Sequence, residues 1–359
     1  MSTISPASLL AQAVTEAARI NAADILWVYN CSPSFKVNDH LVKWEAAGVL
    51  NDETLAGIVK ELVSAEKAET LKNERQVDLA YADGEHRFRV NIFYQRGHIS
   101  IVMRYVRSQI RTLDELGLPN IIRDLVGNDN GLILMVGPTG SGKSTSLAAM
   151  IDHINTNSDK HIITIEDPIE YMYENKQSII EQRELGTDAV SFPAALRSAL
   201  REAPDVILLG EMRDLESIST AITVAETGHL VFSTIHANTA PGTIDRIVDI
   251  FQPGGKDQIR IQLADILIAV LSQRLVPRAD GNGSMAIVET MIANNAVRNA
   301  IRTGNTAQLA NVIQTSSGEG MFLLDDLLVK AVKRQEITKE TALSFANDRN
   351  EVRRALGTV

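Results

Sequence analysis

Cysteine, aromatic residues and long apolar runs are all scarce in this chain of 359 residues. Cys31 is its one cysteine, which excludes an intrachain disulfide and a zinc site made of four thiolates. No apolar run approaches the roughly 20 residues that span a bilayer; the run at 266–271 is short and follows Asp265. The first residues lack a basic stretch before an apolar core, so no signal peptide is expected. We therefore expect a cytosolic protein whose membrane contacts are peripheral.

Positive charge is also in short supply. Lysine and arginine number 35 against 45 aspartates and glutamates, which gives a formal net charge of −10. Proteins that hold nucleic acid by its phosphates usually present a basic face. The negative net charge therefore disfavours a nucleic-acid partner, although it does not exclude a local basic patch. The length, with 45% hydrophobic and 22% charged residues, fits two globular domains.

One glycine-rich stretch has the strongest pattern in the sequence. Residues 132–136 are all apolar and predict a buried strand, and apolar residues at helical spacing begin at Leu147. Between them, residues 137–144 read Gly-Pro-Thr-Gly-Ser-Gly-Lys-Ser and match the phosphate-binding pattern G-x-x-x-x-G-K-[ST]. A strand before the motif and a helix after it form the context that the motif requires.

The residue types of this loop account for its chemistry. Its three glycines let the backbone N–H groups converge on an anion, and the following helix adds partial positive charge. Lys143 can reach the β- and γ-phosphates, and Ser144 can offer its hydroxyl to Mg²⁺. A glycine-rich turn without a ligand does not explain a complete match, so we predict a nucleoside triphosphate site. Its binding residues are Gly137, Pro138, Thr139, Gly140, Ser141, Gly142, Lys143, Ser144 and Thr145.

Residues 1–111 have the pattern of a small α+β domain. Apolar residues recur at helical spacing over 9–20 and 55–63. Strand-like runs at 25–29, 35–37, 76–82, 86–94 and 98–107 include three consecutive ones joined by tight turns, which predicts an antiparallel sheet. A two-residue turn at Arg96-Gly97 would place Arg89 opposite Arg104 on one face. Like charges so placed destabilise a sheet, so either the register differs, the two guanidiniums share an anion, or both are solvated.

The stretch 112–119 is interpreted as a linker, and the pattern changes after it. Buried apolar runs at 132–136, 162–165, 206–209 and 230–233 alternate with helical segments, which is typical of an α/β domain with a mainly parallel sheet. From Asp325 onward the chain is predicted to be helical. We therefore expect an α/β domain at 120–359.

Polar side chains follow the predicted strands of this sheet. Glu166 and Glu170 follow one strand, Glu211 follows the next, and His236 follows a third that His229 precedes. Ligands of open α/β sheets bind outside the carboxyl ends of the strands, and carboxylates there suit Mg²⁺ and a positioned water. The histidines are favoured as sensors of the γ-phosphate or of an adjacent subunit, because no cysteine or third histidine lies nearby for zinc.

Together these motifs resemble the secretion ATPases of type IV pili and type II secretion, most of all the PilT-type pilus retraction (twitching motility) ATPases. The family's phosphate loop, aspartate box, Walker B box and histidine box stand at residues 137–144, 164–170, 205–214 and 227–236. The resemblance covers nearly the whole chain. It implies a RecA-like P-loop ATPase core behind a small N-terminal PAS-like α+β domain. Assembly and type II secretion ATPases carry a four-cysteine zinc insert and an extra N-terminal domain, and with one cysteine and a short N-terminal region this chain is expected to have neither.

The resemblance also implies roles for single residues. Glu211 matches the Walker B acid that holds Mg²⁺ together with Ser144. Glu170 matches the acid that orients the attacking water, and Glu166 is kept as the alternative. The implied catalytic set is completed by the N-terminal-domain arginines that reach the γ-phosphate and by the two histidines. In full it reads Glu166, Glu170, Glu211, Arg89, Arg104, His229 and His236.

Family members are ring hexamers that use ATP and Mg²⁺ and move an inner-membrane platform protein at the pilus base. The expected partners are therefore further copies of this chain, a platform protein and a paralogous retraction ATPase. Residues 296–302 resemble a motif of the retraction type, whereas residues 22–27 depart from the family pattern, so an accessory PilU-type role or another secretion system stays open. A RecA-like DNA translocase and a ring subunit that binds ATP without hydrolysis are further alternatives.

Overall fold

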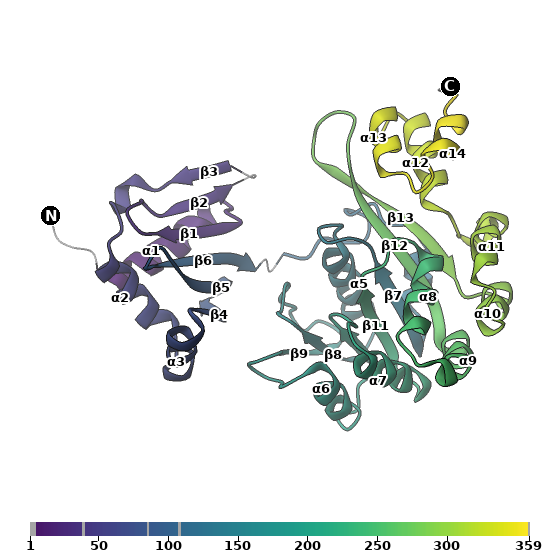
Figure 1. The fold of residues 1–359 in the computed structure, drawn as a ribbon, viewed down its shortest axis with the longest axis horizontal. Coiled ribbons are helices and arrows are strands. Elements are labelled where there is room, and N and C mark those ends of the chain that lie inside the picture. The colour runs from purple at the N-terminus through teal and green to yellow at the C-terminus, as the bar shows by residue number, and fades with distance from the viewer. Residues whose placement is uncertain (1–4, 38–39, 85, 107–108, 358–359) are drawn as a thin grey trace. The chain divides into compact units, whose positions relative to one another are not determined.

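The computed structural model describes residues 5–37, 40–84, 86–106 and 109–357, and the chain forms two compact units, residues 1–108 and 109–359 (Figure 1). Residue 107, the last of a predicted strand, lies outside the described residues. The boundary falls before the stretch interpreted as a linker. Leu113 and Leu118 of that stretch are buried in a hydrophobic cluster of the second unit.

The N-terminal unit is a six-stranded antiparallel sheet with the strand order β3-β2-β1-β6-β5-β4. Its strands are β1 (Asp24–Val28), β2 (Ser34–Val37), β3 (His40–Lys43), β4 (Gln76–Asp83), β5 (His86–Gln95) and β6 (His98–Val106). Its helices are α1 (Pro6–Arg19), α2 (Asp52–Leu62) and α3 (Ala65–Glu74). Side chains of β5 alternate between buried and more exposed positions. This alternation is typical of an antiparallel sheet with one face on a core, and the predicted α+β domain is confirmed.

The predicted register of the hairpin between β5 and β6 is confirmed, because Arg89 pairs with Arg104 across it. The Nε atom of Arg104 donates to Asp24 at 2.8 Å, and the Asp24 side chain is only 8% exposed. The different-register alternative is therefore wrong. The opposed arginines lie on a face where at least one of them is paired with a carboxylate.

The second unit is built on a seven-stranded sheet with the order β13-β12-β7-β11-β10-β8-β9. Its strands are β7 (Gly131–Val136), β8 (His161–Glu166), β9 (Ile179–Glu184), β10 (Val206–Leu209), β11 (Leu230–Ile235), β12 (Leu267–Pro277) and β13 (Ser284–Ile292). Each neighbouring pair from β12 to β9 is parallel, and β13 is antiparallel to β12. The predicted mainly parallel α/β sheet is confirmed.

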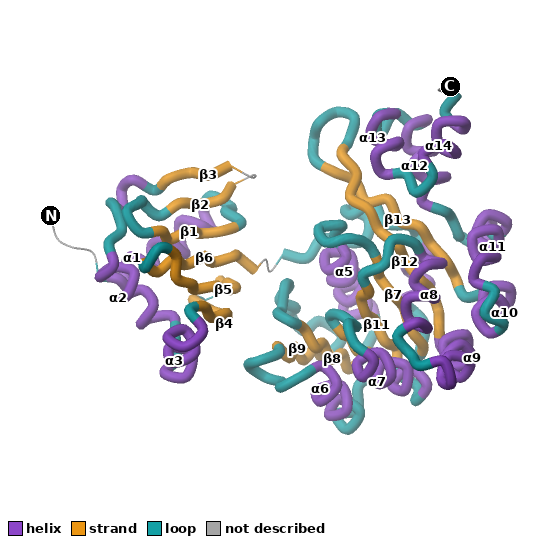
Figure 2. Tube along the Cα trace, in the orientation of Figure 1, coloured by secondary structure: helices purple, strands orange, loops and turns teal. Residues whose placement is uncertain are grey.

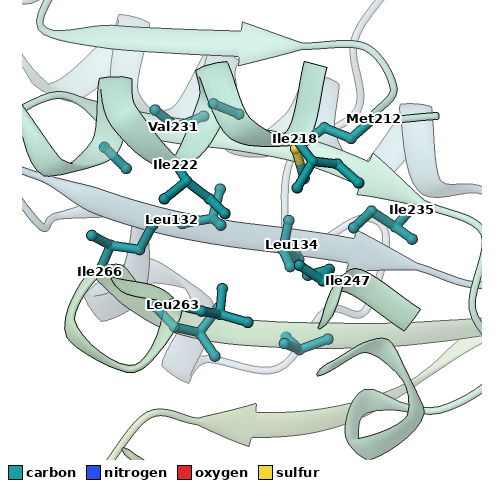
Figure 3. Packing of buried hydrophobic residues seen from close by; sticks show 14 of the residues in the cluster. Leu132, Leu134, Met212, Ile218, Ile222, Val231, Ile235, Ile247, Leu263 and Ile266 are labelled. Atoms are coloured by element: carbon teal, nitrogen blue, oxygen red, sulfur yellow. The ribbon is translucent and has the colours of Figure 1, made fainter. Parts of the chain in front are cut away.

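Helices cover both faces of this sheet (Figure 2). They are α4 (Ile121–Val126), α5 (Lys143–Asn157), α6 (Phe192–Ala199), α7 (Leu215–Glu226), α8 (Ala240–Asp249), α9 (Lys256–Ile266), α10 (Asn295–Arg302) and α11 (Leu309–Thr315). Leu132 and Leu134 of β7 share one cluster with residues of helices α6 to α11, and Figure 3 shows its part with α7, α8 and α9. Ile133 and Met135 join the opposite cluster with α4 and α5. A strand covered on both faces needs apolar residues at every position, which explains the unbroken apolar run.

Three C-terminal helices form a separate small cluster with the ends of β12 and β13, as the helical prediction from Asp325 onward indicated. They are α12 (Leu324–Lys333), α13 (Lys339–Phe345) and α14 (Arg349–Ala355). Among the described residues, no helix has the length and apolarity needed to cross a membrane.

Five elements of the structure, β3, α3, β9, β12 and β13, were not predicted from the sequence. All four residues of β3 are exposed, and Leu71 is the one buried residue of α3, so neither shows an apolar periodicity. β9 is an edge strand with mostly polar residues. In β12, the polar stretch Ser272-Gln273-Arg274 interrupts the apolar run although two of its residues are buried.

Candidate nucleotide-hydrolysis site

Strand register brings most of the predicted site residues to one edge of the large sheet. Val136 pairs with Ile235, while Leu209 pairs with both Ser233 and Ile165. The phosphate loop, the Walker B segment, the end of the histidine box and the aspartate box therefore follow strands that end side by side. The one exception within this unit is the first histidine of the histidine box.

His229 precedes β11 and lies at the opposite edge of the sheet. Its Nδ1 atom lies 3.0 Å from the carbonyl oxygen of Val224, and its own carbonyl accepts the backbone N–H of Gly131. His236 lies seven positions further along the extended chain, which corresponds to roughly 23 Å at the rise of a strand. His229 is thus not brought to the phosphate loop within this unit, and it shapes the start of β11 instead.

Two glycines of the phosphate loop are required by close backbone contacts. Gly137 has φ +144°, and a Cβ atom there would lie 2.5 Å from the carbonyl oxygen of Gln273. Gly142, with φ +83°, precedes α5, and a Cβ atom there would lie 2.8 Å from the Gln273 amide nitrogen. A side chain at either position would require backbone strain and a displaced neighbour. The loop can therefore curl tightly against β12.

The side chain of Lys143 folds back onto the start of the phosphate loop. Its Nζ atom donates to the carbonyl oxygens of Gly137 and Pro138 at 2.9 and 3.0 Å. Burial lowers the pKa of the Lys143 ammonium, and the nearby carboxylates of Glu211 and Glu170 oppose that shift. The ammonium is thus placed where the phosphates of a bound nucleotide would meet it.

Ser144 and Thr145 follow in the first turn of α5 and face different surroundings. Ser144 is exposed, so its hydroxyl is accessible to a ligand. The Thr145 hydroxyl lies 2.8 Å from the Tyr171 hydroxyl and joins the helix to the segment after Glu170. The hydroxyl of Ser144 and the carboxylate of Glu211 are hard oxygen ligands of the kind that Mg²⁺ prefers. This donor set fits the predicted metal.

Glu211 forms the centre of a charged group at the sheet edge. Its Oε1 atom lies 3.1 Å from Nε2 of His236, and its Oε2 atom accepts from Nε of Arg213 at 2.8 Å. The Glu211 side chain is 16% exposed, whereas the His236 side chain is 45% exposed. The structure thus joins Glu211, the predicted Walker B acid, directly to His236, the second histidine of the predicted histidine box.

Glu166 and Glu170 differ sharply in their surroundings. Oε1 of Glu166 accepts from Thr164 at 2.7 Å and from the Gln182 side chain at 3.3 Å. Burial raises the pKa of the Glu166 carboxyl group. Glu170 is exposed, and its backbone N–H approaches Oε2 of Glu166 at 3.5 Å. Of the two acids, Glu170 has the more accessible carboxylate.

Gln273 is a site residue that sequence reasoning missed. It is 1% exposed; its amide nitrogen donates to the Ser141 carbonyl oxygen at 2.7 Å, and its amide oxygen accepts from the Ser146 hydroxyl at 2.8 Å. These contacts fix the phosphate loop to the start of α5. The signal in the sequence was a polar triplet within an apolar run of β12.

The segment after β11 borders a cavity beside the phosphate loop. Its volume is about 420 Å³. The cavity is lined by Gly137, Pro138, His236, Ala237, Asn238, Thr239, Gly242 and Arg246. The open space therefore extends from the loop to His236.

Residues 296–302, which resemble a motif of the retraction type, hold the C-terminal end of α9. Arg298 donates to the carbonyl oxygens of Ala264, Asp265 and Leu267 at the end of α9, and Arg302 donates to the Asp265 carboxylate at 2.7 Å. The two arginines act from one face of α10, as their spacing predicts. Within this unit they stabilise the junction between α9 and β12.

Known proteins resemble this chain over most of its length. Residues 4–353 match the family described as type II/IV secretion system protein. The type IV pilus retraction ATPase PilT of Pseudomonas aeruginosa is 42% identical over 82% of this chain and 85% of its own length. The type IV pilus ATPase PilU of the same organism is 39% identical over 92% of this chain and 87% of its own length.

A solved structure agrees with these sequence relatives. The crystal structure of the pilus retraction motor PilT with bound ADP has a TM-score of 0.89 and 42% identity, and the match covers 96% of this chain and 98% of that one. The predicted RecA-like secretion ATPase core with an N-terminal domain is confirmed by this likeness. The chain is an ATPase that belongs to the type II/IV secretion system protein family, among its PilT-type members.

Proposed function

We propose that this protein is the motor ATPase that retracts type IV pili, working as a Mg²⁺-dependent homo-hexamer at the cytoplasmic base of the pilus. One observation carries the proposal: the phosphate loop, Glu211 and His236 meet at one edge of a parallel sheet. Identity to PilT, whose name assigns it retraction, supports the direction of work. The inner-membrane platform protein and a paralogous retraction ATPase are the proposed partners.

Hydrolysis would rest on positioning and charge. Lys143 and the loop amides hold the phosphates, while Ser144 and Glu211 hold Mg²⁺, which neutralises phosphate charge when bound. Glu170 orients the attacking water, because its carboxylate is accessible whereas that of Glu166 accepts two hydrogen bonds. His236 fixes one oxygen of Glu211.

We further propose that Arg89 and Arg104 of the N-terminal unit approach the γ-phosphate, as the family resemblance implies. Their place on opposite strands gives them one common face. The Asp24 carboxylate already offsets part of the Arg104 charge, and a γ-phosphate on that face would add an anion for both guanidiniums. Domain motion that accompanies hydrolysis would then move a platform protein.

The test is a chromosomal Glu211→Gln allele, scored for surface pili and twitching. A glutamine has the shape of the acid without its charge, so hydrolysis should fail while the ring still assembles. Excess pili without twitching are expected. The matched control is Glu216→Gln, which removes an exposed surface pair with Arg197 and should twitch normally.

The accessory PilU-type role is the second candidate, because identity to PilU is nearly as high as identity to PilT. Normal or absent surface pili in the Glu211→Gln strain would favour that role or another secretion system. The DNA translocase alternative makes a different prediction, since DNA should then stimulate hydrolysis by the purified protein. An unchanged rate with DNA supports the pilus motor.

A further inference from the structure

Glu289 of β13 is a buried carboxylate that the proposed hydrolysis does not use. It is 1% exposed. Oε1 accepts the backbone N–H of Ala240 at 2.6 Å, and Oε2 accepts the backbone N–H of Leu324 at 3.1 Å. These are the first residues of α8 and α12. One carboxylate therefore joins the start of a helix at the site to the start of the C-terminal helices.

The helix α8 begins directly after the segment 236–239, which lines the cavity beside the phosphate loop. The carbonyl oxygen of Asn238 in this segment accepts from Arg274 Nη2 at 2.9 Å and from the Ser272 hydroxyl at 3.2 Å. Glu289 anchors the end of the same segment through Ala240. The strands β12 and β13 therefore hold the segment that carries His236, and His236 contacts the catalytic acid Glu211.

The phosphate loop is held by different atoms. Gln273 points the opposite way from its two neighbours in β12 and bonds to Ser141 and Ser146. Loss of Glu289 would thus free the Ala240 end of the segment 236–239, while Arg274 and Ser272 would still hold Asn238. The loop contacts of Gln273 would stay in place. Nucleotide binding and catalytic geometry have separate supports in this structure.

We propose that Glu289 is a positioning residue, which sets His236 against Glu211 by anchoring the segment 236–239 to the C-terminal helices. The inference rests on the proposed roles of Glu211 and His236 in hydrolysis. A buried carboxylate is costly to desolvate, and apolar residues often stabilise a fold as well or better. We therefore assign Glu289 a role in positioning and not in stability, because its carboxylate accepts hydrogen bonds from the first residues of α8 and α12.

Glu289→Gln tests the proposal, because a glutamine has one acceptor oxygen and leaves one of the two N–H groups unpaired. We expect kcat for ATP to fall by roughly ten- to a hundredfold, the effect of a displaced catalytic group. The KM for ATP and the affinity for ADP should remain near wild type. Partial unfolding would also lower the apparent kcat at unchanged KM, so each rate is divided by the number of ADP-binding sites titrated in the same preparation. A lower kcat per titrated site with unchanged KM is then a result that general destabilisation does not give.

Asp325→Asn is the matched control. The Asp325 carboxylate also accepts two backbone N–H groups, from Asn347 and Asp348 at 2.8 Å each, but it joins α12 to the start of α14 and does not touch the segment 236–239. The melting temperature of Asp325→Asn should fall by less than that of Glu289→Gln, because the hydrogen bonds of Asp325 are exposed whereas those of Glu289 are buried. The kcat of Asp325→Asn should stay near that of the wild type. Equal losses of kcat in both variants, or wild-type kcat in Glu289→Gln, would overturn the proposal.

If Glu289→Gln does not fold, a milder variant tests the positioning of the segment 236–239. Ser272→Ala removes one donor to the Asn238 carbonyl and leaves Glu289 intact. It should lower kcat by a smaller factor and leave the KM for ATP unchanged, and an unaltered kcat would then count against the proposal. If the wild-type protein itself hydrolyses no ATP, the proposed function fails and the positioning role is not at issue.

Discussion

Replacement of Gln273 by leucine is expected to weaken both the fold and nucleotide binding. The change removes the Gln273 amide, which is 1% exposed, and leaves the Ser141 carbonyl and the Ser146 hydroxyl without this partner. Each buried group left without a partner costs about 1–3 kcal/mol. The Ser146 hydroxyl can turn to the carbonyl four residues earlier in its helix, so we expect a net loss of about 2–4 kcal/mol in the free energy of unfolding.

The assay is thermal unfolding with and without ATP. A loss of that size lowers the melting temperature of a domain this large by roughly 5–15 °C. ATP should protect the variant less than the wild type, because bound ligand stabilises in proportion to the logarithm of its concentration over Kd. A tenfold weaker Kd corresponds to about 1.4 kcal/mol less protection at saturation.

The control is Gln262→Leu, at a glutamine whose amide donates to Glu226 at 3.0 Å in an exposed setting on α9. Surface changes of this kind usually stay within about 0.5 kcal/mol. If Gln273→Leu unfolds like this control and binds ATP like the wild type, Gln273 does not support the phosphate loop, and the reasoning from its two hydrogen bonds is wrong.

Two further predictions concern the charged residues of the site. Lys143→Ala should abolish phosphate release from ATP while the protein stays folded, because the ammonium bonds only to carbonyls of its own loop; normal turnover would contradict the assignment. Burial raises the pKa of Glu166 in the folded protein above its value in the unfolded chain. Between these two pKa values the folded protein binds more protons than the unfolded chain, so the free energy of unfolding falls as the pH rises through the folded-state pKa. Glu166→Gln should therefore melt higher than the wild type at neutral pH but not below about pH 4, and it should keep ATPase activity that Glu170→Gln loses. Melting curves against pH and steady-state rates of both variants provide the measurements.

The sequence by itself determined the nucleotide loop and the class of the sheet. A strand buried on both faces must be apolar throughout, and a loop that wraps a phosphate needs glycine where a Cβ atom would collide. Both requirements are local, so the run 132–136 and the motif 137–144 could be recognised without a fold. The pairing of Arg89 with Arg104 was equally local, because a two-residue turn fixes the register of its hairpin.

Only the tertiary structure decided which distant polar groups meet. His229 and His236 belong to one sequence motif, yet a strand runs between them and separates them to opposite edges of the sheet. Gln273 and Glu289 carry no motif, and they act because β12 and β13 bring them against backbone groups far away in the chain. Such contacts depend on which strands are neighbours and where helices begin, and these are properties of the packed chain that no short pattern of residues encodes.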